Sequence, residues 1–352
     1  MKKSRYQWKN QPAVALENDV TLQQAWNKLN SQQAQQPFLS SHAVIAALNQ
    51  LSQGEERLLI AHEEGQPVAM FVLTPAGSFQ WRTFQPSQMP LGVWVAAKHS
   101  TLEDLARSLL HGPIGFCLAL SITQIDPLIA PRQADTPDSS AMDYIDTAWI
   151  DLNSSFEDYW NARGKNLKQN MRKQRAKLEL ENIATRFEVL TKTKDMAQAV
   201  AQFGRLESMG WKEKMGTAIH PDNPQGRFYR DLLEKASLAG EALVCQYLLG
   251  PAVVAMNLCL LRQGNLVVLK TCYDESIKSY SPASLLREAE LQLFFKEGLI
   301  KRIEYFGRMM DWHSKLTDKK RTLHHLTVYR WPMLKQISAY RQKKAIALGE
   351  CA

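Results

Sequence analysis

Residues 266–297 read LVVLKTCYDESIKSYSPASLLREAELQLFFKE, and this stretch decides the fold. Its first part, 266–273, is short and apolar, as expected for a buried strand. The polar segment 274–280 follows, and Ser281-Pro282 then opens a helix predicted over 283–297, because proline is favoured in the first helical turn. The stretch therefore predicts a strand, a turn and a helix in direct succession.

Further short elements surround this unit. Segments 243–249 and 253–261 are predicted to pair as strands across Gly250-Pro251, and 303–306 follows the helix as another strand. The strand–strand–strand–helix–strand order over 241–306 predicts a mixed sheet with helices on both faces, an α/β fold. The other elements predicted in this half are a strand over 186–190 and helices over 196–209, 228–239 and 333–347, with a last strand over 326–330.

The first half of the chain shows a similar order of elements. Helices are predicted over 21–30, 42–51 and 102–110, strands over 57–62, 67–74, 115–122 and 144–152, and a loop over 126–143. At about 100–200 residues per domain, 352 residues suit two domains. We therefore predict a first domain over 1–143, a second over 144–335, and a basic helix or tail over 336–352.

Composition sets the broad class of the protein. The chain is 45% hydrophobic and 22% charged, which is typical of a soluble globular protein and excludes disorder as its main state. The longest apolar run, 114–122, is far shorter than the ~20 residues of a membrane-spanning helix. No apolar run follows the first lysines, so we expect no secretory signal and a cytoplasmic location.

Positive charge is concentrated in two segments. The formal net charge is +8, yet residues 163–177 alone carry +7 and residues 301–352 carry +8. Such segments in an otherwise acidic chain predict an anionic partner: the phosphates of a nucleotide, an RNA or an anionic membrane surface. A solvated helix face is the alternative interpretation.

The segment 163–177 has the pattern of an amphipathic helix. Lys168, Arg172 and Arg175 share one helical face at i, i+4 and i+7. The apolar stripe beside them consists of Trp160, Leu167, Met171 and Leu178. We expect this helix to pack its stripe on a domain and to present its cations to solvent or to a partner.

Several phrases in one order resemble a known family. They are residues 156–159, LKQNMRKQRAKL at 167–178, LESMGWKEKMGTAI at 206–219, FYRDLL at 228–233, KTCYDESIKSYSPASLL at 270–286 and EYFGRMMDWHSKL at 304–316. Together they resemble the GNAT superfamily of N-acyltransferases, in particular the CelD-like acyltransferases associated with cellulose biosynthesis, which are related to the FemABX-type tandem GNAT proteins. The resemblance covers about 156–330, and the first half is similar to the family only in its layout, as a degenerate GNAT-like domain.

The resemblance implies an acyltransferase that moves an acyl group from a thioester, acyl-CoA or acetyl-CoA, to an amine or hydroxyl. It also implies a small-molecule or saccharide acceptor, in polysaccharide or envelope biosynthesis. The reaction needs a base, stabilisation of the thioester oxygen and a site for the pyrophosphate of coenzyme A. A strand, a turn and a helix N-terminus supply the last, because free N–H groups and the helix dipole attract phosphate. The predicted donor-binding residues are Lys278, Tyr280, Ser281, Ala283 and Ser284.

The turn departs from the superfamily signature, Gln/Arg-x-x-Gly-x-Gly/Ala. DESIKSYSPAS at 274–284 contains no glycine, and Ala283 stands where relatives often carry Gly. A side chain at this point hinders close approach of the backbone to a pyrophosphate, for which Lys278 would compensate as a point charge. A plain strand-to-helix turn is the alternative interpretation.

Four residues near strand ends are the predicted catalytic groups. Glu304 and Asp274 are the predicted general bases, and Tyr273 would donate a proton to a leaving thiolate or alcohol. Lys270 lies on the presumed central strand, where a buried lysine is costly without a partner, and Asp274 or Glu304 is the expected partner.

Three further residues are predicted to bind the acceptor. Trp211 and Lys212 stand in a loop with glycines nearby and would supply a wall and a charge clamp. A Trp that plugs the core beside a solvated Lys is the alternative. Lys315 resembles a lysine of the family's closing motif.

Two other functions remain open at this point. The basic helix 163–177 and the basic tail would hold an aminoacyl-tRNA, as FemABX relatives do, or an acyl carrier protein, in a transferase with a different donor. The glycine-free turn also suits a non-catalytic scaffold that binds an anionic partner. No metal site is predicted, because His313, His324 and His325 are too irregularly spaced.

Overall fold

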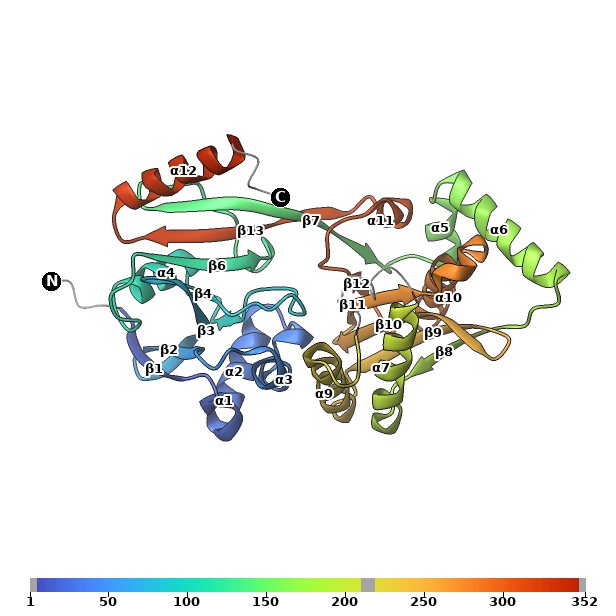
Figure 1. The fold of residues 1–352 in the computed structure, drawn as a ribbon, viewed down its shortest axis with the longest axis horizontal. Helices are drawn as coiled ribbons and strands as arrows, with labels where there is room; N and C mark the ends of the chain where they lie inside the picture. Colours follow the sequence, from blue (N-terminus) through green and yellow to red (C-terminus); the bar gives the residue numbers. More distant parts are fainter. Residues whose placement is uncertain (1–4, 210–218, 348–352) are drawn as a thin grey trace. The chain divides into compact units, whose positions relative to one another are not determined.

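The computed structural model describes residues 5–209 and 219–347 of the chain (Figure 1). Its internal contacts divide the chain into two compact units. Unit 1 comprises Met1–Leu48, Ser52–Ile145 and Thr322–Ala352, and unit 2 comprises Asn49–Leu51 and Asp146–Arg321.

The compact units differ from the predicted domains at the second boundary. The sequence placed a boundary after residue 335, whereas the chain returns to unit 1 at Thr322. The reason is a strand pairing: β13 (Lys320–Tyr329) lies antiparallel to β6 (Ala119–Ile125). Residues 322–329 therefore belong to the sheet of unit 1.

Unit 1 is built on a mixed sheet. Its strands are β1 (Gln7–Pro12), β2 (Arg57–Glu63), β3 (Gln66–Gly77), β4 (Gln80–Thr83), β6 and β13, paired in that order, with β5 (Trp94–Ala96) on β3. The predicted hairpin is confirmed, because β2 and β3 pair antiparallel. Strands β4 and β6 are parallel, which makes the sheet mixed.

Four helices of unit 1 follow the predicted segments closely: α2 (Val20–Gln33), α3 (Ser41–Leu51), α4 (Leu102–Leu110) and α12 (Pro332–Ala347). The sequence did not predict α1 (Ala15–Asn18) or the 3-10 helix η1 (Pro37–Leu39). Trp26 of α2 is fully buried and its indole donates to the Leu39 carbonyl at 2.7 Å, which fixes α2 against η1.

Two predictions in this half were wrong in their bounds. The strand expected at 115–122 is β6, which begins only at Ala119. The loop expected over 126–143 ends early, because β7 (Ser139–Asp151) begins inside it. The Asp- and Ser-rich composition of that segment hid the start of the strand.

Unit 2 holds the predicted core. Its strands pair in the order β7, β12 (Arg302–Glu304), β11 (Asn265–Tyr273), β10 (Ala252–Arg262), β9 (Ala242–Leu249) and β8 (Thr185–Leu190). β11 and β12 are parallel and the other neighbours are antiparallel. The predicted mixed sheet is confirmed.

Helices cover both faces of this sheet. Lys270 of β11 contacts α7 (Thr193–Ser208), which packs with α9 (Pro224–Leu238). Asn257 of β10 contacts α10 (Pro282–Glu297) instead. Asn257 precedes Leu258, the partner of Lys270 in the register, and successive side chains of a strand point to opposite faces. Helices α7 and α10 therefore lie on opposite faces, as predicted.

The basic segment forms a helix as expected. It is α6 (Lys165–Leu180), preceded by α5 (Phe156–Asn161). Met171 and Leu178 are buried in the core of unit 2, and Trp160 and Leu167 pack against that core. The predicted apolar stripe is confirmed.

Within the described ranges, no helix has the length and apolar character needed to cross a bilayer.

Candidate functional site

The parallel pairing of β11 with β12 is short. Only Asn265, Leu266 and Val267 pair with Arg302, Ile303 and Glu304. Val268 and Lys270 then pair with consecutive residues of β10, so Leu269 is the extra residue of a bulge in β11. A bulge bends its strand. Over residues 268–273, β11 continues to pair with β10, whereas its pairing with β12 has ended at Val267.

Helix α10 begins beside the end of β11. Ser281 is its N-cap residue, with φ of +54° and no capping hydrogen bond from its side chain. The amides of Ser284 and Leu285 both donate to the Ser281 carbonyl, at 2.9 and 3.1 Å. Pro282 has no amide hydrogen. Among the described residues, the amide of Ala283 has no partner, and it is the group that this helix start offers to an anion.

The turn between β11 and α10 is a 3-10 helix, η2 (Glu275–Tyr280), where the sequence predicted a loop. The Asp274 carboxylate caps it by accepting from the Ser276 amide at 2.9 Å and from the Ser276 hydroxyl at 2.6 Å. The Ser281 amide donates to the Lys278 carbonyl at 3.0 Å. Much of the hydrogen-bonding capacity of the turn is therefore used internally, while the Lys278 side chain is exposed.

Tyr280 is tied to helix α6. Its hydroxyl donates to the Glu181 carboxylate at 2.5 Å, which raises the pKa of Tyr280, and the Lys177 ammonium lies 3.9 Å from its ring centre. The predicted donor-binding role of Tyr280 thus competes with a contact inside the protein.

Lys270 has a partner that the sequence did not suggest. Its ammonium lies 3.1 Å from the carboxylate of Glu207 on α7, so the expected pairing with Asp274 or Glu304 was wrong. Glu207 is 3% exposed and also accepts from the Ile219 amide at 2.8 Å. The sequence did contain one indication that Glu207 pairs with a cation. It stands four residues after Phe203, on the apolar face of its helix, where a carboxylate needs a positively charged partner.

Glu304 is buried between guanidinium groups. It lies 2.9 Å from Arg321 and 3.6 Å from Arg302. The carboxylate is therefore engaged by cations from two residues. Neither predicted base, Glu304 or Asp274, is therefore a free carboxylate in the structure.

A second polar cluster lies under α10, and the sequence prediction did not include it. Asn257 donates to the Glu290 carboxylate at 2.7 Å, and burial raises the pKa of Glu290 to about 7. One turn earlier, burial lowers the pKa of Arg287, whose guanidinium stacks 3.7 Å from the ring centre of Trp312. Burial also raises the pKa of the Tyr305 hydroxyl, which follows β12. The sequence did offer one indication of this cluster: Arg287 and Glu290 stand at i and i+3 and so share one face of the helix.

A cavity of about 510 Å³ lies beside the start of α10. It is within the range of small-molecule sites. Its walls come from the start of α6, the first turn of α10 and the end of α11 (Asp311–Leu316). The lining residues are Ala162, Arg163, Gly164, Asn166, Leu167, Asn170, Ser284, Ser314, Lys315 and Asp318.

Two of the predicted residues, Ser284 and Lys315, meet in this cavity. Arg163 lines it too, held by a 2.8 Å hydrogen bond to the Leu316 carbonyl and lying 4.9 Å from the ring centre of Tyr159. Neither Arg163 nor Lys315 forms an ion pair with a carboxylate among the described residues. The cavity therefore joins two cations to serine hydroxyls, with Asp318 as an acidic member.

The remaining predicted residues are not part of this cavity. Tyr273, at the end of β11, is 37% exposed. Trp211 and Lys212 lie outside the described residues. In the described ranges, no group of His, Cys, Asp and Glu side chains is arranged to hold a metal ion.

Comparison with known proteins identifies the domain that carries this site. Residues 165–314 match the family model described as an acetyltransferase (GNAT) domain. No curated protein matches the chain.

Several solved structures share the fold at low sequence identity. The C-terminal domain of a putative lysylphosphatidylglycerol synthetase from Agrobacterium fabrum has a TM-score of 0.57 at 12% identity, over 86% of this chain and 92% of that one. The L-PGS structure from Bacillus licheniformis has a TM-score of 0.51 at 14% identity, over 82% and 87%. FemX has a TM-score of 0.50 at 9% identity, over 80% and 90%. Residues 165–314 therefore match an acetyltransferase (GNAT) domain, and the chain shares its fold with these proteins.

Proposed function

We propose that unit 2 transfers an acyl group from a thioester donor, acyl-CoA, to an amine or hydroxyl acceptor. The observation that carries this proposal is the separation of β11 from β12 after Val267, next to the uncapped start of α10. Beyond Val267, the edge of β11 that β12 does not cover would offer a backbone N–H group to a thioester oxygen on which charge develops. The Ala283 amide offers a hydrogen bond to a phosphate.

The residues around the cavity fit the phosphate-bearing end of such a donor. Ser284 belongs to the first turn of α10, and Lys315 and Arg163 add two cations to the same cavity. This arrangement compensates for the glycine-free turn, because side chains supply contacts that the backbone of the turn does not. The Asp318 carboxylate would repel the donor phosphates in part, so both cations, Lys315 and Arg163, are needed to bind them.

Tyr273 is the residue best placed to protonate a leaving group. It stands where β11 ends, on the stretch of the strand that extends beyond β12, and part of its side chain reaches solvent. The Lys270–Glu207 pair lies on the α7 face of the same strand, where it would orient an acceptor. Trp211 and Lys212 stay predictions for the acceptor site.

Calorimetric titration with acetyl-CoA and longer acyl-CoAs tests the proposal. The wild-type protein should bind one of them, and Lys315→Gln should weaken binding. A folded protein that gives no heat with any acyl-CoA would contradict the acyl-CoA donor.

A second donor class has support of its own. Lys165, Arg172 and Lys173 on α6 are exposed, whereas Arg175 is neutralised by Glu288 and Lys177 lies on Tyr280. The free cations suit an aminoacyl-tRNA or an acidic acyl carrier protein. This alternative also agrees with the fold shared with FemX and the lysylphosphatidylglycerol synthetase domain.

Salt dependence separates the two donors. Binding to tRNA or to acyl carrier protein should weaken steeply between 50 and 200 mM salt and should be reduced by Arg172→Gln with Lys173→Gln. Acyl-CoA binding should be unaffected by that pair of substitutions.

Four further points stay predictions: a saccharide or envelope acceptor, the CelD-like relationship, a cytoplasmic location, and the alternative of a non-catalytic scaffold. Loss of function in the α6 variants, with none in variants of Lys270 and Tyr273, would favour the scaffold.

A further inference from the structure

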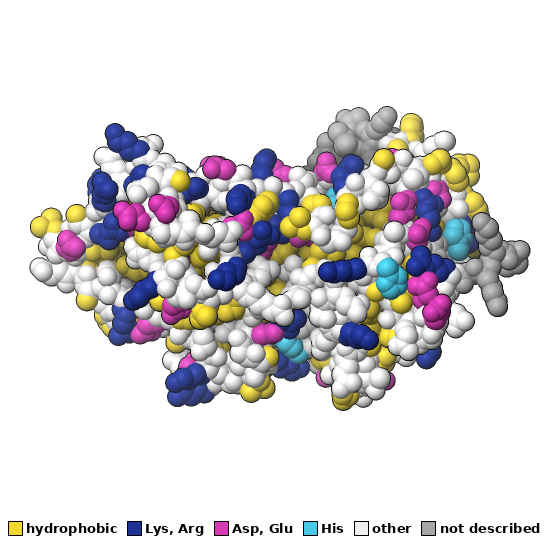
Figure 2. All heavy atoms as spheres, turned by 180° about the vertical axis from the view of Figure 1, so that it is seen from behind, with side chains coloured by type: hydrophobic (Ala, Val, Ile, Leu, Met, Phe, Trp, Pro, Cys, Tyr) yellow, Lys and Arg dark blue, Asp and Glu magenta, His cyan; other side chains and the backbone are white. Residues whose placement is uncertain are grey.

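Unit 1 carries an exposed aromatic and apolar surface that the proposed acyl transfer does not use. We define the α12 surface by six residues: Phe79, Phe116, Trp331, Met333, Ile337 and Tyr340. Their exposed fractions run from 39% for Ile337 to 69% for Tyr340. Figure 2 shows hydrophobic side chains gathered over α12, at the upper right of that view.

Three of these side chains form a continuous aromatic group. The ring centres of Phe79 and Phe116 are 5.5 Å apart, and those of Phe116 and Trp331 are 6.2 Å apart. Phe79 holds its exposed position with φ of +59°, a conformation that a bulky residue rarely adopts. Its carbonyl accepts from the Leu118 amide at 2.7 Å, which fixes the turn between β3 and β4.

The other three side chains share one face of α12. Met333, Ile337 and Tyr340 stand at i, i+4 and i+7. Among the described side chains of the helix, these are exposed, whereas Leu334, Lys335 and Ser338 are half-buried. The apolar residues at these three positions therefore lie on the side of α12 turned away from the sheet.

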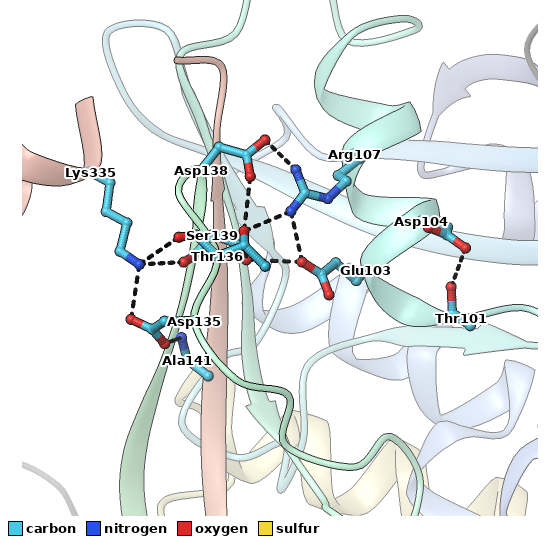
Figure 3. A network of polar contacts seen from close by, with 10 residues as sticks. All are labelled: Thr101, Glu103, Asp104, Arg107, Asp135, Thr136, Asp138, Ser139, Ala141 and Lys335. Atoms are coloured by element: carbon cyan, nitrogen blue, oxygen red, sulfur yellow. Dashed lines mark hydrogen bonds and ion pairs between the residues drawn. The ribbon is translucent and has the colours of Figure 1, made fainter. Parts of the chain in front are cut away.

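The inner side of α12 is fixed to unit 1 by polar contacts. The Lys335 ammonium donates to the carbonyls of Thr136 and Ser139, both at 2.7 Å, and pairs with Asp135 at 3.0 Å (Figure 3). Arg107 of α4 holds the same segment through Asp138 and Thr136 (Figure 3). The outer face is thus presented by a firmly attached helix, and packing does not require its apolar residues.

Two arginines accompany the α12 surface. Arg341 of α12 is exposed, and the sequence of the helix contains no acidic residue. The Arg330 guanidinium lies 5.1 Å from the ring centre of Phe116 and is oriented by carbonyls of Cys117 and Leu110, both at 2.6 Å. These arginines disfavour a basic partner and suit an anionic one.

We propose that the α12 surface binds the surface of an anionic lipid bilayer. Helices that lie in the interface of a bilayer combine Trp, Phe and other apolar residues on one face with flanking Lys and Arg. Trp and Tyr favour the headgroup level because their rings are amphipathic. The exposed Trp331 and Tyr340, the apolar Met333 and Ile337 between them, and the arginines Arg330 and Arg341 match this composition.

Flotation with vesicles tests this proposal. Full-length protein should float with vesicles of phosphatidylcholine containing 30% phosphatidylglycerol and much less with pure phosphatidylcholine, and added salt should weaken the binding. Met333→Ser with Ile337→Ser should lower the partition coefficient about tenfold or more. Arg341→Gln should lower it about fivefold.

A control removes two apolar side chains from unit 2 that are even more exposed than Met333 and Ile337. Leu180→Ser with Leu238→Ser, at 83% and 79% exposure, should leave vesicle binding unchanged. Circular dichroism and Tm should show that both double variants are folded. Because the α12 surface lies in unit 1, acyl-CoA titration should be the same for wild type and the α12 variants, which separates this proposal from the transferase proposal.

Three results would overturn the membrane surface. One is absence of flotation with the anionic vesicles at 50 mM salt. Another is equal loss of binding in the α12 and control double variants. The third is a concentration-dependent dimer, seen by light scattering, that the Met333/Ile337 variant abolishes while vesicle binding is unchanged, which would assign the surface to a second copy of the chain.

Discussion

The ammonium of Lys270 on β11 lies 3.1 Å from the carboxylate of Glu207 on α7, on the face of the sheet opposite α10. Glu207 is almost fully buried, and the Lys270 side chain is 17% exposed. Removal of one partner takes the opposite charge away from a buried ion pair, which is costly. The pair therefore fixes α7 to the strand that leads into the proposed donor site.

We expect Lys270→Met to lower the free energy of unfolding by about 3 kcal/mol, because the buried Glu207 carboxylate would lose the ammonium that lies 3.1 Å from it. Urea denaturation at pH 7 measures this change. The exposed pair of Lys320 with Asp146 is the matched control, and Lys320→Met should cost less than about 1 kcal/mol. Adding Glu207→Gln to Lys270→Met should restore much of the loss, and a double variant no more stable than the single one would contradict the argument.

Glu290 makes stability depend on pH. Burial raises its pKa from the ordinary value of 4.5 to about 7, so the folded protein binds a proton that the unfolded chain releases between these values. Stability should therefore fall as pH rises through the window from 4.5 to 7, by at most about 3 kcal/mol from this group. In Glu290→Gln the side chain no longer titrates, and its amide oxygen can still accept the hydrogen bond from Asn257.

The measurement is the difference in unfolding free energy between wild type and Glu290→Gln at pH 5 and pH 8. We expect the variant to gain stability relative to wild type at pH 8. The comparison removes the contribution of His313, whose pKa burial lowers to about 4 and whose effect runs in the opposite direction. An equal difference at both pH values would show that Glu290 is ionised throughout.

The local sequence pattern was sufficient to predict the strands and the helix in the core of unit 2. The strand at 266–273 and the helix from 282 were predictable because apolar alternation, Ser-Pro and Gly298 act over neighbouring residues. The start of β7 at Ser139 was not predictable, because pairing with a strand far along the chain overrides the turn-like composition of its first residues. Only the tertiary pairing of β13 with β6 shows that residues from 322 rejoin unit 1.

The candidate site was predictable where it depends on the helix start. Ser284 was predicted for the donor site and Lys315 for the acceptor site, and the structure places both in the lining of one cavity. The partner of Lys270 could not be predicted, because a strand residue and a helix residue 63 positions apart meet only in the folded chain. For the same reason the sequence did not show that Arg302 and Arg321 neutralise Glu304.

Lys315 should matter for donor binding and little for stability. It is exposed in the cavity beside Ser284 and forms no ion pair with a described carboxylate. We expect Lys315→Gln to raise the Kd for acyl-CoA about fivefold to tenfold, because one cation next to a phosphate is lost. Lys296→Gln, at the other end of α10 and equally exposed, is the control and should bind like wild type. Equal Kd values for the two variants would place the phosphates elsewhere.

Tyr273 should affect turnover more than binding. If its hydroxyl protonates the leaving group, Tyr273→Phe should lower kcat about 100-fold or more and change KM little, since a general acid acts in the transition state. Tyr144, an exposed tyrosine of unit 1 at 43%, is the matched control, and Tyr144→Phe should keep full activity. Steady-state kinetics with the acyl-CoA and acceptor found by titration measure both constants. A Tyr273→Phe enzyme with unchanged kcat would remove Tyr273 from the chemistry and leave proton delivery to solvent at the open edge of β11.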